Sequence, residues 1–197
     1  MERTLFLARH GQTTANRQRV FAGSTDVLLD ETGRAQAAAL AQHPALSSVR
    51  TVYASHLRRA HDTAAARGAP VRVVPELAEM HQGVLEGVPL ADALRDHGAL
   101  VKAWVDDPVG VRIPGAETLD EVGQRAIAAL TRIAWHAPPG DVLVVSHQLT
   151  LAAVSCIVVG APLSRWRDHS LANCGSVRLQ FCRGSWLLTP ADGSGGT

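Results

Sequence analysis

A cation, an imidazole and a glycine stand side by side where the first apolar run of the chain ends, at Arg9-His10-Gly11. The guanidinium of arginine is a planar, bidentate donor that suits phosphate, and histidine can act as a nucleophile near neutral pH. Glycine lets the backbone approach a ligand closely. The three residues together predict phosphoryl chemistry with His10 as the attacking group.

A histidine that attacks phosphorus needs cations, a donor for developing charge and an acid for the leaving oxygen. Arg59 is the candidate second cation, near the start of a predicted helix, where backbone N–H groups also favour anions. His147 follows the most apolar predicted strand and is the candidate donor to a phosphoryl oxygen, as an imidazolium. Glu79 is the candidate acid. With Arg9, these residues predict a phosphate pocket around His10.

Each candidate also has a structural interpretation. Arg59 taken alone is typical of a solvated helix charge, and His147 of a hydrogen-bonded histidine in the core. Glu86 lies close to Glu79 in the chain and is expected to be structural or to face the substrate. Gln12 either lines the pocket or caps the segment that follows it.

Short apolar runs bounded by charge or by turn residues predict strands over 4–8, 51–54, 71–74 and 141–146, and a C-terminal hairpin of 176–181 with 185–188. Helical patterns cover 32–43, 57–67, 90–105, 118–136 and 149–159. Ser55 is expected to cap the second of these helices, and Thr118 and Glu121 have the spacing of a capping box. Residues 107–115 are predicted to form a loop.

Strands that alternate with helices predict an α/β protein, a three-layer sandwich in which helices cover both faces of a mostly parallel central sheet. Such sheets bind ligands at the carboxyl ends of their strands. Arg9 and His10, the segment 55–59, and His147 each follow a predicted strand. We therefore expect these segments to meet at one edge of the sheet.

Four motifs occur in order along the chain, and together they are far more specific than Arg-His-Gly alone. They are Arg9-His10-Gly11-Gln12-Thr13 with Asn16, Ser55-His56-Leu57-Arg58-Arg59-Ala60, Glu79 with Gly83 and Glu86-Gly87, and Val145-Ser146-His147, with smaller matches at Gly23 and Asp26. In this pattern the chain, from residue 3 to residue 190, resembles the histidine phosphatase superfamily. This is the phosphoglycerate-mutase-like clan, and the resemblance is to its phosphatase-leaning branch.

The resemblance implies a phosphoglycerate-mutase-like fold in a single domain over residues 1–190, with a small helical cap segment at about 88–115. The Gly- and Ser-rich sequence of 191–197 predicts a disordered tail. The resemblance also implies a phosphohistidine on His10 that water then hydrolyses, with Glu79 as proton donor to the leaving alcohol. The implied catalytic residues are His10, Glu79, His147, Arg9 and Arg59. The expected phosphate- or substrate-binding residues are Arg9, Gln12, Asn16, Gly23, Arg59, His147 and Gln148. Neither a metal nor a cofactor is expected.

One position departs from the family pattern, which usually has glycine directly after the second histidine. This chain has Gln148 there. The backbone N–H of that residue can still point at phosphate, whereas its amide side chain either crowds the pocket or adds a contact. The departure therefore concerns affinity and substrate preference, not the nucleophile.

The expected function is a phosphomonoesterase that acts on a small-molecule phosphate ester. A phosphoglycerate-type mutase is the main alternative, since it uses the same histidine and differs in what attacks the phosphohistidine; the family's mutases tend to be longer than this chain. A non-catalytic relative that binds phospholigands is a third alternative, favoured only by Gln148. The segment 88–113 mixes acidic and basic residues, which predicts a leaving group that is neutral or partly apolar.

The bulk composition excludes several classes of protein. Of 197 residues, 46% are hydrophobic and 19% are charged, which predicts a packed core. The formal net charge of +1 provides no broad field for nucleic acid or an anionic membrane. Three cysteines without paired spacing predict reduced thiols and a cytoplasmic location. The C-terminal strands are compatible with either a free sheet edge or a homodimer contact, and the sequence does not decide between them.

Overall fold

The computed structural model describes residues 2–190; Met1 and residues 191–197, which include the tail predicted to be disordered, lie outside the described residues. The strands are β1 (Glu2–Arg9), β2 (Val49–Ala54), β3 (Val71–Val73), β4 (Asp141–Ser146), β5 (Ser176–Cys182) and β6 (Ser185–Pro190). The α-helices are α1 (Thr14–Gln18), α2 (Glu31–Ala41), α3 (Arg58–Ala65), α4 (Leu90–Asp106), α5 (Leu119–His136) and α6 (Gln148–Val159). Short 3₁₀ helices are η1 (Pro44–Leu46), η2 (Pro75–Leu77), η3 (Gly83–Leu85) and η4 (Leu163–His169).

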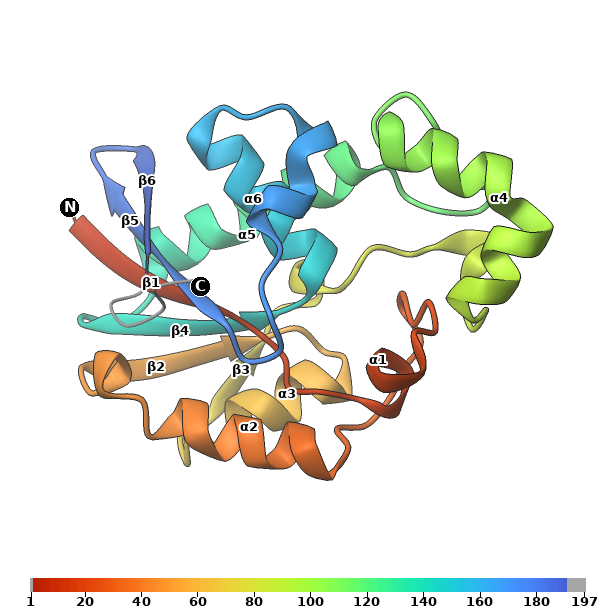
Figure 1. Cartoon of the computed structure of the whole chain (residues 1–197). Helices are drawn as coiled ribbons and strands as arrows, with labels where there is room; N and C mark the ends of the chain where they lie inside the picture. Colours follow the sequence, from red (N-terminus) through yellow and green to blue (C-terminus); the bar gives the residue numbers. More distant parts are fainter. Residues whose placement is uncertain (1, 191–197) are drawn as a thin grey trace.

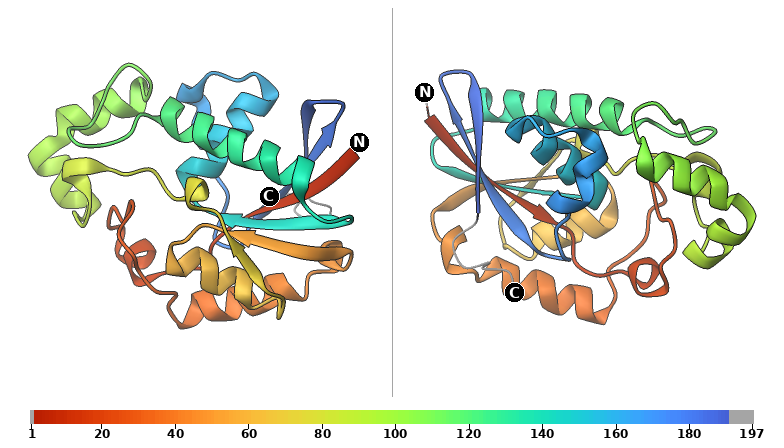
Figure 2. Two further views of the ribbon diagram at one scale, coloured as in Figure 1. Left: turned by 180° about the vertical axis from the view of Figure 1, so that it is seen from behind. Right: turned by 45° about the horizontal axis from the view of Figure 1, so that its top comes forward.

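The described strands form one six-stranded sheet in the order β3-β2-β4-β1-β5-β6. β1 pairs in parallel with β4, and β2 pairs in parallel with β4 and β3. β5 and β6 form the predicted hairpin and join β1 in the antiparallel direction. Helices α2 and α3 cover one face of the sheet and α5 and α6 the other (Figures 1 and 2). The predicted three-layer sandwich around a mostly parallel sheet is confirmed.

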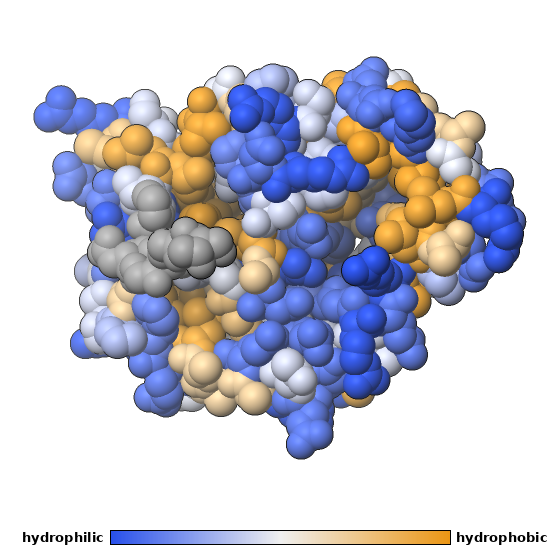
Figure 3. Space-filling model, viewed as in Figure 1, coloured by the Kyte–Doolittle hydropathy of each residue, from blue (hydrophilic) through white to orange (hydrophobic). Residues whose placement is uncertain are grey.

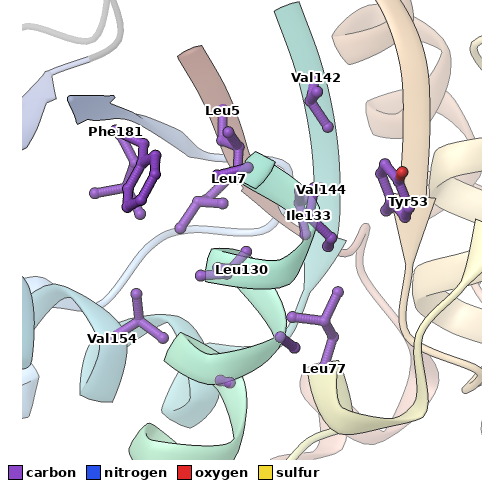
Figure 4. Close-up of a cluster of buried hydrophobic side chains, with 14 of the residues drawn as sticks. Leu5, Leu7, Tyr53, Leu77, Leu130, Ile133, Val142, Val144, Val154 and Phe181 are labelled. Atoms are coloured by element: carbon purple, nitrogen blue, oxygen red, sulfur yellow. The ribbon is translucent and has the colours of Figure 1, made fainter. Parts of the chain in front are cut away.

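The central strands are apolar at consecutive positions because both of their faces are buried. Side chains alternate across a strand, so Leu5, Leu7 and Val144 face α5 and α6, as Figure 4 shows. Their neighbours Phe6 and Leu143 face α2 and α3 instead. This double burial fixes the strand register and with it the edge at which the site residues emerge.

Helix α4 lies beyond the carboxyl ends of the strands, where the segment 88–115 was expected to form a cap (Figure 1). Val101 and Trp104 bury their side chains against Leu119 of α5 and Leu149 of α6 in a second apolar cluster. The helix departs from helical geometry at His97, with φ of −131° and ψ of 24°. The cluster ties this segment to the helices that follow the site.

The prediction that Ser55 caps the next helix is wrong. Helix α3 begins at Arg58, its N-cap is Leu57, and the hydroxyl of Ser55 accepts a hydrogen bond from the Leu57 N–H at 3.2 Å instead. The carboxylate of Asp26 accepts from the Arg58 N–H at 2.7 Å and so supplies the cap from a distant loop. A cap residue is normally adjacent to its helix, and a partner so far away leaves no local signal.

No single helix among residues 2–190 is long and apolar enough to cross a membrane; one bent pair, α6 with η4 at 110°, meets the length and composition criteria together.

Candidate active site

The predicted residues come together at the carboxyl ends of β1, β2 and β4. Seven of them line an inner cavity of about 190 Å³: Arg9, His10, Asn16, Gly23, Arg59, Glu79 and Gln148. An outer cavity of about 440 Å³ shares part of this wall and adds Gln12. His147 lines neither cavity. Figure 3 shows the surface hollowed here, between α4 and the body of the molecule.

The ring of His10 is held in one tautomer. Its Nδ1 lies 2.7 Å from the carbonyl oxygen of Gly11, and because a carbonyl only accepts, Nδ1 carries the proton and Nε2 keeps its lone pair. The Gly11 N–H donates to the hydroxyl of Thr63 at 3.0 Å, and that hydroxyl donates to the carbonyl of Arg59 at 2.7 Å. Helix α3 thus fixes both the turn that orients His10 and the Arg59 side chain.

Gly11 is glycine for a reason that its neighbours in sequence do not reveal. A Cβ at Gly11 would lie 2.5 Å from the carbonyl oxygen of Gly33, in the first turn of α2. We expected the missing side chain of Gly11 to let a ligand approach the backbone. The structure shows instead that it lets the backbone of α2 approach.

Burial and the neighbouring Arg59 guanidinium lower the pKa of His10 from 6.5 to about 3. In the unfolded chain the ordinary pKa returns, so between these values the unfolded state binds a proton that the folded state does not, and protonation favours unfolding. We expect the free energy of unfolding to fall as the pH drops from 6.5 towards 3, by about 2 kcal/mol between pH 7 and pH 5 from this group. Urea unfolding at pH 7, 6 and 5 measures the slope.

The variant His10→Gln is the control for that experiment, because it removes the titrating group and keeps a polar side chain. Its stability should fall less steeply over the same pH range. Equal slopes for the two proteins would contradict the assignment of the pH dependence to His10. Burial also lowers the pKa of His147 well below 6.5, which adds to the slope of both proteins in the same direction.

Arg59 is a buried cation, 2% exposed, whose guanidinium is oriented by backbone oxygens. It donates to the carbonyl of Thr25 and to the carbonyl of Gly23, each at 2.7 Å. Arg9 donates to the carbonyl of Leu171 at 2.8 Å. Burial lowers the pKa of both guanidiniums. One buried and one half-buried guanidinium, both held by neutral carbonyls, place positive charge at the inner cavity.

Glu86 orients Arg59 through the loop that supplies those carbonyls. One of its carboxylate oxygens accepts from the N–H of Ser24 at 2.7 Å and from the N–H of Gln82 at 3.0 Å. The hydroxyl of Ser24 donates to the same carboxylate. A Cβ at Gly23 would lie 2.2 Å from the Oε1 atom of Glu86. Of the two expectations for Glu86, the contacts support the structural one.

We expect Glu86→Gln to lower kcat/KM about tenfold for every substrate, because an amide cannot accept the full set of hydrogen bonds and Arg59 loses its fixed position. Steady-state assays with a phenolic and an alkyl phosphate measure the effect. The matched control is Glu76→Gln, an exposed carboxylate that pairs with Arg132, which should change little. A loss confined to the alkyl phosphate would place Glu86 at the leaving oxygen instead.

The carboxylate of Glu79 lies at the N-terminus of α6. It accepts from the N–H of Leu149 at 3.1 Å, and from the N–H and the hydroxyl of Thr150 at 3.2 and 3.1 Å. Arg125 of α5 donates to the carbonyls of Ala78 and Glu79, at 2.9 and 3.2 Å. The Glu79 side chain lines the inner cavity, and α5 and α6 hold Glu79 in place through these hydrogen bonds.

His147 is fully buried beside His10, with ring centroids 5.1 Å apart. Neither of its ring nitrogens has a hydrogen-bond partner among the described residues. Because a buried polar group without a partner is costly, this is an unusual place for a core histidine. The interpretation of His147 as a hydrogen-bonded core residue is not supported by these contacts.

The remaining predicted residues differ in what holds them. Asn16 lines both cavities, and its side-chain oxygen accepts from the Thr13 N–H at 3.1 Å, in a capping box of α1. Gln12 lines the outer cavity, and its N–H donates to Gln36. Gln148 lines both cavities as the first residue of α6.

Sequence reasoning missed Asn173, whose amide donates to the carbonyl of His10 at 3.0 Å and to the side chain of Asn16 at 3.3 Å. It also missed Arg125, which pairs with Glu117 at 2.7 Å and fixes the backbone at Glu79. Neither residue belongs to a motif, and the site carbonyls that they contact, those of His10 and Glu79, lie 163 and 46 residues away in the chain. No group of three or more His, Cys, Asp or Glu residues within residues 2–190 is placed to hold a metal ion.

Comparison with known proteins gives the site its context. The family model of the histidine phosphatase superfamily (branch 1) matches residues 5–191. The chain belongs to the histidine phosphatase superfamily. That family is the one that the Arg9-His10-Gly11 and His147 motifs resemble, and the resemblance is confirmed.

Relatives within the superfamily carry different activities in their names. "Probable phosphoglycerate mutase GpmB" of Yersinia pestis is 31% identical over 189 residues, which is 94% of this chain and 88% of the relative. The structure of a mycobacterial glucosyl-3-phosphoglycerate phosphatase with VO3 has a TM-score of 0.86 at 29% identity, covering 98% of this chain and 100% of the other. The α-ribazole phosphatase of Shigella flexneri has a TM-score of 0.83 at 26% identity, with 96% of each chain covered.

Proposed function

We propose that this chain is a metal-independent phosphomonoesterase that acts on a small-molecule phosphate ester through a phosphohistidine on His10. The observation that carries the proposal is the His10 ring, buried beside Arg9 and Arg59 with its Nδ1 proton held by the Gly11 carbonyl. A neutral imidazole with a free Nε2 is a nucleophile, and two adjacent guanidiniums are ligands for phosphoryl oxygens.

In the first step the Nε2 lone pair of His10 forms a bond to phosphorus while the bond from phosphorus to the leaving oxygen breaks. Protonated Glu79 gives its proton to that oxygen, so a neutral alcohol leaves. Arg9 and Arg59 bind the phosphoryl oxygens, and the positive charge of the two guanidiniums offsets the negative charge that develops on these oxygens. His147, with two unpartnered ring nitrogens, donates to a phosphoryl oxygen once phosphate supplies the counter-charge.

In the second step water attacks phosphorus and the bond to Nε2 of His10 breaks. The carboxylate of Glu79 accepts the proton that water loses, which restores both residues and releases inorganic phosphate. Asn16, Gly23 and Gln148 line the same cavity and are proposed to contact the phosphoryl group or the start of the leaving group, with Gln12 further out.

A phosphoglycerate-type mutase is the second candidate, favoured by the name of the relative from Yersinia pestis. The two functions share the first step and differ in whether water or a second hydroxyl takes the phosphoryl group. The purified chain is given a monophosphoglycerate with a bisphosphoglycerate primer, and ³¹P NMR follows both products. Phosphate release faster than isomerisation supports the phosphatase; the reverse order overturns it.

A further inference from the structure

The outer cavity has apolar walls and a cationic border. Its volume is about 440 Å³, and six of its wall residues are Phe21, Leu90, Val101, Trp104, Ile113 and Trp166. The rings of Trp104 and Trp166 lie 5.9 Å apart. Figure 3 shows apolar side chains beside the hollow, on the side of α4. A leaving group in this cavity is held mainly by its apolar or planar body.

Two exposed arginines line the outer cavity: Arg19, which ends α1, and Arg167, in η4. Neither guanidinium has a hydrogen bond or an ion pair among the described residues. The Arg167 guanidinium lies over the ring of Trp166, 4.5 Å from its centroid, which holds it at the cavity wall. The described lining contains no aspartate or glutamate, so these cations are available to a ligand.

Three other cations on the helices beside the cavity are paired with carboxylates. In α4, Arg95 pairs with Asp92 and Lys102 with Asp106, at 2.6 and 3.1 Å. In η4 itself Arg165 pairs with Asp168 at 2.7 Å. The balance of charge in the segment 88–113 therefore says little about the ligand, because its cations Arg95, Lys102 and Arg112 are all paired with carboxylates.

We propose that Arg19 and Arg167 receive an anionic group, a carboxylate or a second phosphate, carried by the leaving alcohol at the far end of an apolar body. The proposal rests on the phosphomonoesterase function proposed above and deepens it. Guanidiniums bind both groups through paired N–H donors. It replaces the neutral leaving group that the sequence of 88–113 predicts, because the unpaired cations come from outside that segment.

Three substrates with one ring test the proposal: phenyl phosphate, 4-carboxyphenyl phosphate and 1,4-phenylene bisphosphate. We expect the wild type to prefer at least one anionic probe over phenyl phosphate about tenfold in kcat/KM. Arg19→Gln and Arg167→Gln should each lower that preference about threefold, and the double variant should abolish it. Phenyl phosphate itself should be hydrolysed equally by all of them. Intrinsic leaving-group reactivity contributes to the wild-type preference, but it cancels when each variant is compared with wild type on the same substrate.

The controls separate charge from position. Arg17→Gln removes an exposed arginine of α1 that does not line the cavity and should leave the preference unchanged. Arg19→Lys and Arg167→Lys keep the positive charge and should retain most of the preference for the anionic probe. Addition of 0.5 M salt should reduce that preference. Which of the two anionic probes is preferred shows whether the arginines bind a carboxylate or a second phosphate.

The two proposals fail differently. Hydrolysis of phenyl phosphate with no preference for either anionic probe, or with a preference that survives in the double variant, overturns the anion site and leaves the phosphatase standing. Failure to release phosphate from any of the three probes overturns both.

Discussion

His10→Ala abolishes phosphoryl transfer: we expect kcat to fall by about 10⁴-fold or more for every substrate, and no phosphorylated protein to form. The reason is that the described lining of the inner cavity contains no second histidine and no cysteine, serine, threonine or lysine, and water in the vacated space lacks the fixed approach of Nε2. The wild type is mixed with a ³²P-labelled ester, quenched in alkali, where phosphohistidine survives, and separated on a denaturing gel. Label on the wild type alone is the expected result.

His56→Ala is the matched control, since His56 is an exposed histidine near the same sheet edge that lines neither cavity. It should label and turn over as the wild type does. Circular dichroism and inorganic phosphate binding show whether the His10→Ala variant is folded with an intact arginine pair. Label or normal turnover in a folded His10→Ala protein would falsify the phosphohistidine mechanism.

The sequence allows the sheet edge to be predicted because β1 and β4 are apolar runs that end in chemistry-bearing residues. Parallel strands bring their carboxyl ends to one edge, so His10 and His147 meet there once the strands are recognised. The runs are unambiguous because both faces of each strand are buried. Short elements were missed for the opposite reason: α1 and η4 bury little and show no periodicity.

What positions the site residues could not be predicted, because it depends on pairs far apart in the chain. Asp26 caps α3, Glu86 holds the loop under Arg59, and Arg125 fixes the backbone at Glu79. Each contact joins a charged side chain to backbone atoms, which carry no residue-type signal. The motifs identify which residues act, whereas their geometry comes from tertiary structure.

The unpaired cations of the outer cavity illustrate the same limit. Counting charges over 88–113 treats every side chain as available, yet Arg95 and Lys102 are paired with carboxylates of their own helix. Arg167 is distant in sequence, and only the fold places it at the cavity. Substrate preference is therefore set by which charges remain unpaired after folding, and not by the composition of the segment.

Glu79→Gln should make the rate depend strongly on the leaving group. For glycerol phosphate, whose alkoxide leaves poorly without a proton, we expect kcat/KM to fall about 10³-fold. For p-nitrophenyl phosphate, whose leaving group is stable as an anion, the fall should be tenfold or less. The amide oxygen of glutamine can still accept from the N–H groups of Leu149 or Thr150, so the fold at the start of α6 is kept.

The same variant tests the second step, because kcat/KM reports only steps up to departure of the alcohol, whereas hydrolysis of the phosphohistidine needs Glu79 as a base. With p-nitrophenyl phosphate we expect a burst of nitrophenol equal to the enzyme concentration and accumulation of ³²P label on His10 in Glu79→Gln. Glu76→Gln, three residues away with a side chain that is 41% exposed, should show neither. An equal loss of kcat/KM for both esters, without a burst, would assign Glu79 to binding the phosphoryl group and contradict its role as the acid.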